Sequence, residues 1–341
     1  MARKNNAMLT PLGSIYRTMR KLSLLVAGLL VASATAHAAC EDIQAAKTKP
    51  ECSINLPYQL KQAEKGDAKA QFQLGLAYEK GRGIAKDEAV AAKWYKKSAD
   101  QGNLDAMHNL AKLYSAGRGV IKNEAEAFRL EKHAAERGHA YAQNGLGLHY
   151  LQGRGVPKNS KAAIDWLKKS AEQGMPNASG NLGKLYSRGD GVPADHAEAF
   201  KWYQKAAIAG DADAQFQLSR MFKLGRGVPQ DYSKSILWCE KSANQGYAMA
   251  QTAMGIRYMS GRGVPQSLIE AAKWFSKSAA QGEEEAQYAL GLFYEKGYGV
   301  VKNIDQARKL YEASAKQGNK LAKSHLDKLL RQAEQKQPQG N

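Results

Sequence analysis

The sequence has 341 residues, with 50 lysines and arginines against 32 aspartates and glutamates, and its formal net charge is +18. It has three cysteines and no Cys-x-x-Cys, which gives no support to a redox motif or a zinc knuckle. The basic residues are spread along the chain, and its first segment directs it out of the cytosol, so we set nucleic-acid binding aside. The charge then indicates either a solvated surface or a site for an acidic partner.

Residues 1–38 have the pattern of a secretory signal peptide. Arg20 and Lys21 form a positive end, residues 22–34 are an apolar run too short to span a bilayer, and Ala36-His37-Ala38 is a cleavage site of the small-x-small type. We predict cleavage near Ala38 and a periplasmic or secreted protein. Loss of the five basic residues of this segment lowers the formal charge from +18 to +13. The stretch before Arg20 is long for a leader, so the chain starts at either Met1 or Met19.

The segment 39–65 precedes the regular part of the sequence and contains two of the cysteines. In an oxidising compartment we expect Cys40 and Cys52 to form a disulfide. Cys40 also follows Ala38-Ala39, which leaves a lipid anchor on Cys40 open, although His37 stands where a lipobox has a branched apolar residue. The third cysteine, Cys239, lies in a predicted helix next to Trp238, and we expect a buried thiol.

A 36-residue repeat dominates the rest of the chain. Glycine recurs without insertions at residues 66, 102, 138, 174, 210, 246, 282 and 318. Counted from each of the first seven glycines, position four is always alanine, position eight is leucine or methionine, and position twelve is tyrosine or phenylalanine. A spacing of four places these residues on one helical stripe. Position nine is always small, which indicates that a second helix crosses close by.

A Gly-x-Gly loop follows this first helix, and its first glycine suits the left-handed conformation that ends a helix. A second helix then begins at a residue whose side chain can accept from free backbone amides. The predicted N-caps are Asp87, Asn123, Asn159, Asp195, Asp231, Ser267 and Asn303. Position 28 of this helix is tryptophan in five repeats.

One such hairpin cannot bury its apolar stripe alone, so neighbouring hairpins must stack. The sequence therefore predicts an all-α fold, an alpha-alpha solenoid of seven 36-residue helix–loop–helix repeats over residues 66–317. A lone second helix from Leu56 to Lys65 and a lone first helix within residues 318–333 are expected to cap its ends. Residues 334–341 are polar and form a predicted flexible tail.

The pattern Gly-x3-Ala-x3-Leu-Gly-x2-Tyr, followed by Gly-x-Gly-Val-Pro and Ala-x2-Trp-Tyr-x-Lys-Ala-Ala, resembles the Sel-one-like repeat. This family is related to the tetratricopeptide repeat. The resemblance implies an α-solenoid whose concave face is lined by the first helices, and adaptor roles, often in bacterial secreted or periplasmic proteins. It also implies that an immunity protein, which neutralises a secreted effector, is one possible role.

By analogy with tetratricopeptide grooves, positions 3, 6, 10, 13 and 14 of the first helices face the concavity, and these positions vary between the repeats. We expect this groove to bind a protein with an acidic surface or segment. The candidate residues are His108, Lys112, Tyr141, Asn144, Asn177, Lys184, Arg188, Phe216, Arg220 and Lys223. Met249, Ile256, Met259 and Tyr288 form either a second contact zone or packing against the next helix.

Catalysis has little support in the residue pattern. Cysteine-rich relatives described as β-lactam-hydrolysing carry a cysteine pair in each repeat, whereas the repeats here contain only Cys239. The sequence lacks Ser-x-x-Lys, Gly-x-Ser-x-Gly and His-Glu-x-x-His, and the six histidines after residue 38 occupy six different repeat positions. We therefore expect no metal, no cofactor and no enzymatic activity. A β-lactam or cell-wall-peptide hydrolase, and a protein that binds anionic glycan or lipid, are the alternatives.

Overall fold

The structure is a computed structural model, and it describes residues 56–334. The chain divides into residues 1–61 and residues 62–341, and the second unit contains all the hairpins. The predicted signal peptide, Cys40 and Cys52 with their expected disulfide, and residues 335–341 of the predicted tail lie outside the described residues. Between residues 56 and 334 every regular element is a helix.

The helices follow the predicted repeat. The first helices of the seven repeats are α4 (Ala68–Lys80), α6 (Leu104–Ala116), α8 (Ala140–Gln152), α10 (Pro176–Arg188), α12 (Ala212–Leu224), α14 (Ala248–Ser260) and α16 (Glu284–Lys296). The second helices are α5 (Glu88–Asp100), α7 (Glu124–Glu136), α9 (Ser160–Glu172), α11 (His196–Ile208), α13 (Tyr232–Asn244), α15 (Leu268–Ala279) and α17 (Ile304–Lys316). The two expected end helices are α3 (Leu56–Glu64) and α18 (Lys320–Glu334).

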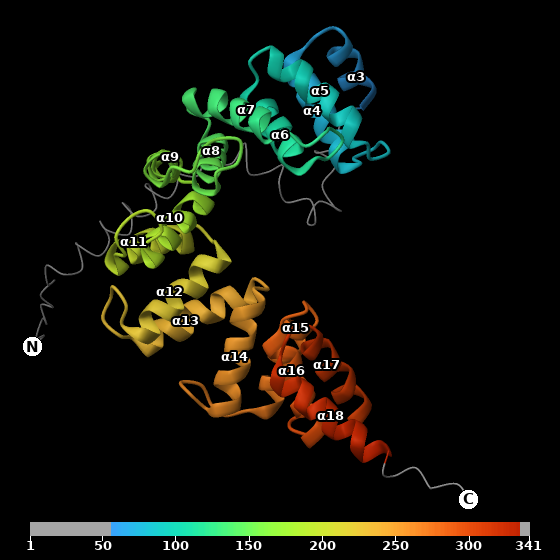
Figure 1. The fold of residues 1–341 in the computed structure, drawn as a ribbon, viewed down its shortest axis with the longest axis vertical. Coiled ribbons are helices and arrows are strands. Elements are labelled where there is room, and N and C mark those ends of the chain that lie inside the picture. Colours follow the sequence, from blue (N-terminus) through green and yellow to red (C-terminus); the bar gives the residue numbers. More distant parts are fainter. Residues whose placement is uncertain (1–55, 335–341) are drawn as a thin grey trace, which may run out of the picture. The chain divides into compact units, whose positions relative to one another are not determined.

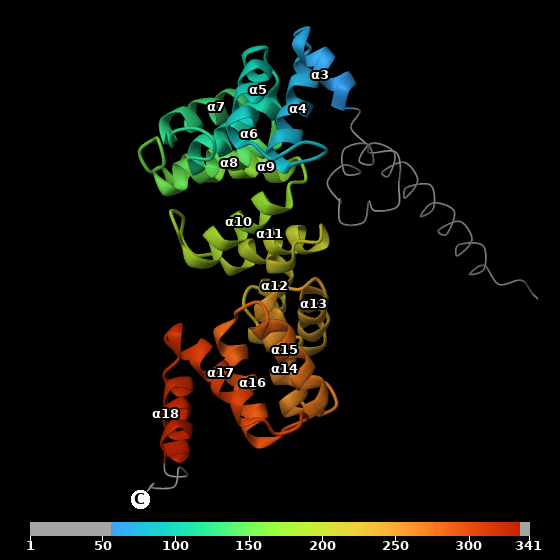
Figure 2. The same cartoon turned by 90° about the vertical axis from the view of Figure 1, so that its right-hand side faces the viewer.

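Each first helix packs against the second helix of its own repeat, and each second helix packs against the first helix of the next repeat (Figure 1). The last second helix, α17, packs against α18 in the same way (Figure 2). The buried residues are mainly the alanines, leucines and aromatic side chains of the repeat pattern. The predicted all-α solenoid of seven repeats is therefore confirmed.

All seven predicted N-caps are confirmed, because the side chain at each of these positions accepts a hydrogen bond from a backbone amide in the first turn of its helix. The first helices have a cap of their own at position one, which the sequence analysis missed. Asp67, Asn103, His139, Asp211 and Glu283 accept there from the amide three residues later.

The small residue at position nine has the predicted role. In the fourth repeat, a Cβ atom added to Gly183 would lie 2.7 Å from the ring of Tyr203, which comes from the second helix. The same close approach joins Gly75 to Tyr95, Gly147 to Leu167, Gly255 to Phe275 and Gly291 to Tyr311. The side chain at position 29 therefore fills the space that the missing side chain at position nine leaves open.

The second glycine of each Gly-x-Gly loop has a role that the sequence analysis did not find. A Cβ atom at Gly119 would overlap the backbone of Glu88 in the preceding repeat, and Gly155 approaches Glu124 in the same way. Gly83 of the first repeat has the same left-handed conformation but no atom within 4 Å of the added Cβ. These glycines therefore allow the loop of one repeat to pack on the start of the second helix of the repeat before it.

A ladder of glutamines also joins the hairpins. Gln215 Nε2 donates to the carbonyl oxygen of Ala207 in the preceding repeat, and Gln245 Nε2 donates to Gln215 Oε1 within the same repeat. Equivalent pairs recur in four other repeats. Because Gln215 is buried, these bonds satisfy a side-chain amide that could not be left without a partner, whereas Gln245 is exposed.

The environment of Cys239 and the length of the apolar helices can also be compared with what the sequence predicts. Cys239 is buried, with 1% of its surface exposed, as predicted, and burial raises the pKa of its thiol. No helix in the described part of the chain is both long and apolar enough to cross a membrane.

Two glycines of α10 allow a direct test of the helix crossing. An alanine at Gly180 meets no atom within 4 Å, whereas an alanine at Gly183 overlaps the ring of Tyr203. We expect Gly180→Ala to raise the free energy of unfolding by up to about 1 kcal/mol, through helix propensity alone. Gly183→Ala should lower it by about 1–3 kcal/mol because of overpacking. Urea unfolding followed by circular dichroism measures both, and equal effects of the two substitutions would contradict the proposed crossing.

Candidate partner-binding surface

The first helices of successive repeats contact one another through polar and aromatic side chains. Asn181 Nδ2 on α10 donates to Asn144 Oδ1 on α8, at 3.1 Å. Phe216 on α12 lies with its ring centroid 5.6 Å from that of Tyr247, the residue before α14. These contacts join consecutive first helices within the second unit. We call the exposed side chains of the first helices the first-helix face.

The predicted cations of the fourth and fifth repeats are Lys184, Arg188, Arg220 and Lys223, which we call the basic centre. One acid, which the sequence analysis passed over, lies among them. Lys184 Nζ on α10 lies 2.6 Å from Asp213 Oδ2 on α12. Asp213 Oδ1 accepts hydrogen bonds from the Tyr247 hydroxyl at 2.9 Å and from Gln217 Nε2 at 3.1 Å. Burial alone would raise the pKa of Asp213, but the hydrogen bonds from Lys184, Gln217 and Tyr247 outweigh it and hold that pKa below its ordinary value. Asp213 therefore neutralises Lys184 and ties three repeats together.

The remaining predicted cations stay available to a ligand. Lys112, Arg188 and Lys223 are exposed and form no ion pair within residues 56–334, and the exposed Arg220 donates only to Gln217 Oε1, at 3.3 Å. The charges of Arg188 and Arg220 both reach the hydroxyl of Tyr203, whose pKa is raised chiefly by burial. Arg188 is on α10, the helix of Lys184, and Arg220 is on α12, the helix of Asp213.

The cations of the second helices have a different environment. Most of them lie against a carboxylate of their own helix or against an aromatic ring. The lysine at position 31 lies 4.1–4.5 Å from the centroid of the tryptophan at position 28 in five repeats. Lys93, Lys161 and Lys309 are the exceptions among the described second helices. The first helices of the fourth and fifth repeats, by contrast, carry three exposed cations without an ion pair among the described residues: Arg188, Arg220 and Lys223.

The other predicted residues divide into internal and exposed ones. Asn144 and Phe216 are half-buried and use their side chains in the contacts between helices already described. Asn177 is exposed at the start of α10. Tyr141 is 44% exposed, and its ring packs against those of His108 and His139 at 5.9 Å. Lys112, His108 and Tyr141 belong to the second and third repeats and form a group separate from the basic centre.

His108 pairs with a buried acid that the sequence analysis missed. Its Nδ1 atom lies 2.9 Å from Oε1 of Glu131, which is only 3% exposed. Glu131 occupies position 29, which holds an aromatic residue, leucine or cysteine in the other repeats. Space for it comes from Gly145 in the next repeat, where an added Cβ atom would lie 2.5 Å from Glu131 Oε1. The signal in the sequence that could have revealed this pair is the acidic residue at position 29, where no other repeat has one.

The apolar end of the first-helix face is open to solvent. On α14, Met249 is 46% exposed, and Ile256 and Met259 are each 36% exposed. Leu224, at the end of α12, is 48% exposed. Tyr288 differs, because it is half-buried and its ring packs against those of Tyr311 and His325. The sequence left open whether these residues form a second contact zone or pack against the next helix. Tyr288 packs against neighbouring rings, whereas Met249, Ile256 and Met259 are exposed.

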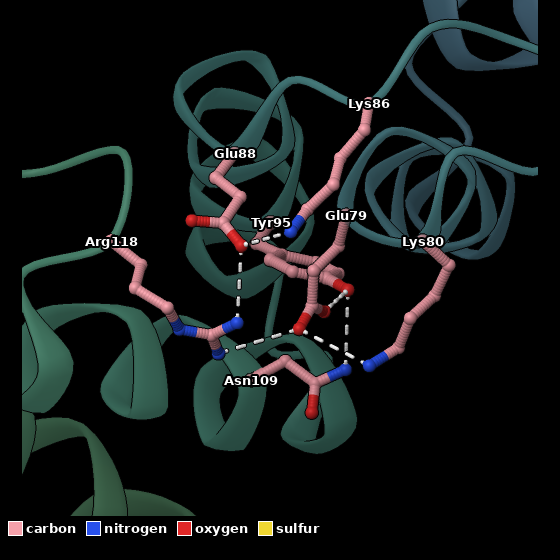
Figure 3. A network of polar contacts seen from close by, with 7 residues as sticks. All are labelled: Glu79, Lys80, Lys86, Glu88, Tyr95, Asn109 and Arg118. Carbon is pink, nitrogen blue, oxygen red and sulfur yellow. Dashed lines mark hydrogen bonds and ion pairs between the residues drawn. The ribbon is translucent and has the colours of Figure 1, made fainter. Parts of the chain in front are cut away.

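Position thirteen is structural in the first and last repeats. Glu79 is buried, accepts from the Tyr95 hydroxyl at 2.7 Å, and is approached by Lys80 and Arg118 (Figure 3). Burial alone would raise the pKa of Glu79, but Tyr95, Lys80 and Arg118 together lower it. Glu295 occupies the same position in the seventh repeat and accepts from Tyr311 at 2.7 Å. These two carboxylates anchor the second helix and are not part of the ligand surface.

No group of three or more metal-ligating side chains occurs among residues 56–334. A pocket of about 220 Å³ lies between α5, α6 and α7 and is lined by Lys96, Met107, Arg129 and His133, among others. None of the ten predicted site residues lines it. This pocket is therefore separate from the ten predicted site residues.

The Sel1 repeat matches seven consecutive segments of the chain: residues 68–103, 104–139, 140–175, 176–211, 212–247, 248–283 and 284–319. The chain belongs to the Sel1 repeat family. These segments cover each helical hairpin in turn, so the resemblance inferred from the sequence is confirmed. Comparison with curated proteins finds no match.

Solved structures of Sel1 repeat proteins are similar to this chain. A Sel1 repeat protein from Oxalobacter formigenes is 36% identical, with a TM-score of 0.67 over 80% of this chain and 79% of that protein. A protective antigen of uropathogenic Escherichia coli strains is 35% identical, with a TM-score of 0.62 over 80% of this chain. The chain spans 66% of the length of that antigen. An immunity protein from Pseudomonas aeruginosa, 24% identical with a TM-score of 0.41 over 64% of this chain and 82% of that protein, is too distant to support a shared function.

The hydrogen bonds of Glu295 predict an acid-dependent loss of stability. Burial alone would raise its pKa, but Lys296, Tyr311 and His325 hold it at about 2, below the ordinary value of 4.5. Ionised Glu295 therefore stabilises the folded state above pH 4.5, and this contribution is lost as the pH falls from 4.5 towards 2. Glu295→Gln should lower the free energy of unfolding by urea at pH 6, and by less at pH 3.

The exposed Glu172 provides the control for this measurement. Glu172→Gln should have the same small effect at both pH values. A Glu295→Gln effect that does not change between pH 6 and pH 3 would contradict the assigned ion pairs.

Proposed function

We propose that this chain is a non-catalytic scaffold that captures an acidic segment of another protein on its first-helix face. One observation carries the proposal: Arg188, Arg220 and Lys223 are exposed without an ion pair among the described residues, whereas most cations of the second helices are paired or lie on aromatic rings. A carboxylate that reaches this surface gains charge-assisted hydrogen bonds without displacing an internal partner. Electrostatic complementarity of this kind favours both the rate and the specificity of association.

An adaptor and an immunity protein both need such a surface, and the nature of the captured protein separates them. If the partner is a secreted enzyme, its activity should fall as it binds in an immunity complex. If the partner is a component of an envelope assembly, its own function should persist in the complex.

We further propose that the protein acts in the periplasm or outside the cell. The support is the signal-peptide pattern of residues 1–38, which lie outside the described residues. Mass spectrometry of protein recovered from the native envelope should find a mature chain that begins near Ala39, with Cys40 and Cys52 joined. An intact leader would contradict export, and a lipid mass on Cys40 would show a membrane anchor.

Charge reversal tests the proposed capture. The variant Arg188→Glu/Arg220→Glu/Lys223→Glu should lose at least about tenfold in affinity for partners recovered from the native envelope fraction. The control, Lys93→Glu/Lys161→Glu/Lys309→Glu, changes the net charge by the same amount at exposed residues of the second helices and should bind as the wild type does. Recovery of the same partners by the wild type and the first variant would refute the proposal.

A further inference from the structure

The strict register of the repeats places equivalent positions of neighbouring first helices side by side. No insertion interrupts the 36-residue spacing, and contacts such as Lys184 with Asp213 and Phe216 with Tyr247 join consecutive repeats. Neighbouring packed helices lie about 10 Å apart. A change of residue type at one position is therefore a change in surface chemistry over about 10 Å of the face.

Such a change occurs between the fifth and sixth repeats. Positions 10 and 13 hold Arg220 and Lys223 on α12, but Ile256 and Met259 on α14. All four side chains are exposed. Met249, seven residues before Ile256, extends the apolar stripe along α14, since residues spaced by seven lie on one side of a helix. Basic side chains on α12 and exposed apolar side chains on α14 thus occupy equivalent positions of consecutive first helices.

The Asp213 network fixes this junction. Through Lys184 and Tyr247, Asp213 connects α10, α12 and the first residue before α14. Its carboxylate forms an ion pair with Lys184, whereas Arg188, Arg220 and Lys223 have no ion pair among the described residues. The acid is therefore part of the framework, and the basic side remains attractive to carboxylates.

The apolar side has the composition of an adaptable contact surface. Methionine is flexible and polarisable, and surfaces that expose it can repack around different apolar side chains. Leu224 adds a further exposed apolar side chain at the end of α12. A purely acidic ligand would leave this apolar surface in water, whereas a ligand with apolar side chains beside its carboxylates would bury it.

Building on the proposed function, we infer that repeats four to six form a two-part docking surface for a protein segment in which carboxylates lie next to apolar side chains. The carboxylates bind to Arg188, Arg220 and Lys223, and the apolar side chains pack on Met249, Ile256 and Met259. In an extended segment, about three residues span the distance between neighbouring first helices, because each residue adds about 3.3 Å. The acidic and apolar groups should therefore be separated by about three residues.

The experiment is a selection of peptides on the immobilised mature protein, with a library of random peptides of about 12 residues, which span about 40 Å when extended. The wild type should enrich peptides with aspartate or glutamate about three residues from leucine, methionine or phenylalanine. Arg188→Gln/Arg220→Gln/Lys223→Gln should abolish the acidic preference, and Met249→Gln/Ile256→Gln/Met259→Gln should abolish the apolar one. Either variant should weaken binding of the best wild-type peptide by at least about tenfold.

The control is Ile208→Gln/Leu237→Gln/Ile269→Gln, which removes three exposed apolar side chains from second helices and should change neither preference. Unchanged circular dichroism and melting temperature show that each variant is folded. Acidic peptides that bind the α14 variant as well as the wild type would overturn the two-part surface and leave the proposed function intact. Absence of any acidic preference would refute both. Tighter binding to phosphatidylglycerol vesicles than to any peptide, weakened in both variants, would identify a membrane ligand and overturn the inference.

Discussion

The close crossing of the two helices in each repeat is the constraint on which the rest of the structure depends. At this crossing a large side chain at position 29, such as Tyr203, packs into the space left by a glycine at position nine, such as Gly183. Because the contact is tight, it fixes the rotation of the first helix about its axis as well as its distance from the second. The same rotation, repeated in each hairpin without insertions, brings equivalent side chains to the same surface of every repeat. The ligand surface is thus a consequence of the packing inside each hairpin.

The second repeat shows how this constraint can be relaxed. It has Ala111 at position nine and Glu131 at position 29, so it lacks both partners of the usual contact. The carboxylate of Glu131 is accommodated by Gly145 in the next repeat and pairs with His108. Its Oε2 atom is buried without a hydrogen-bond partner among the described residues. Gly145, at position seven of the third repeat, therefore provides the space that the side chain at position 29 needs, at the cost of a polar group that is not fully satisfied.

Much of the scaffold could be predicted from the sequence because its causes are local. The N-caps, the left-handed glycines and the small residue at position nine each follow from spacing within one repeat. Apart from the caps at position one of the first helices, the missed features act between repeats. Gly119 is needed because the backbone of Glu88 in the previous repeat lies against it. Asp213, on the first helix of the fifth repeat, neutralises Lys184 on the first helix of the fourth. A sequence gives the type of these residues, but their partners become visible only when the repeats are placed next to one another.

The residues predicted to line the groove lie on the first helices, and their side chains have unequal roles. Asn144, Phe216 and Lys184 use their side chains to hold neighbouring repeats together. Arg188, Arg220 and Lys223 remain exposed, and they lie beside an apolar stripe on α14. The variable positions of a repeat protein thus serve two purposes, and burial together with pairing distinguishes them.

Hydrogen exchange of the mature protein, measured by mass spectrometry with and without a captured partner, tests the central claim most directly. Binding on the first-helix face should slow exchange in α10, α12 and α14, and leave α11, α13 and α15 close to their unbound rates. Protection confined to the second helices, with α10, α12 and α14 unchanged, would show that the partner is held by the opposite surface and would contradict the account.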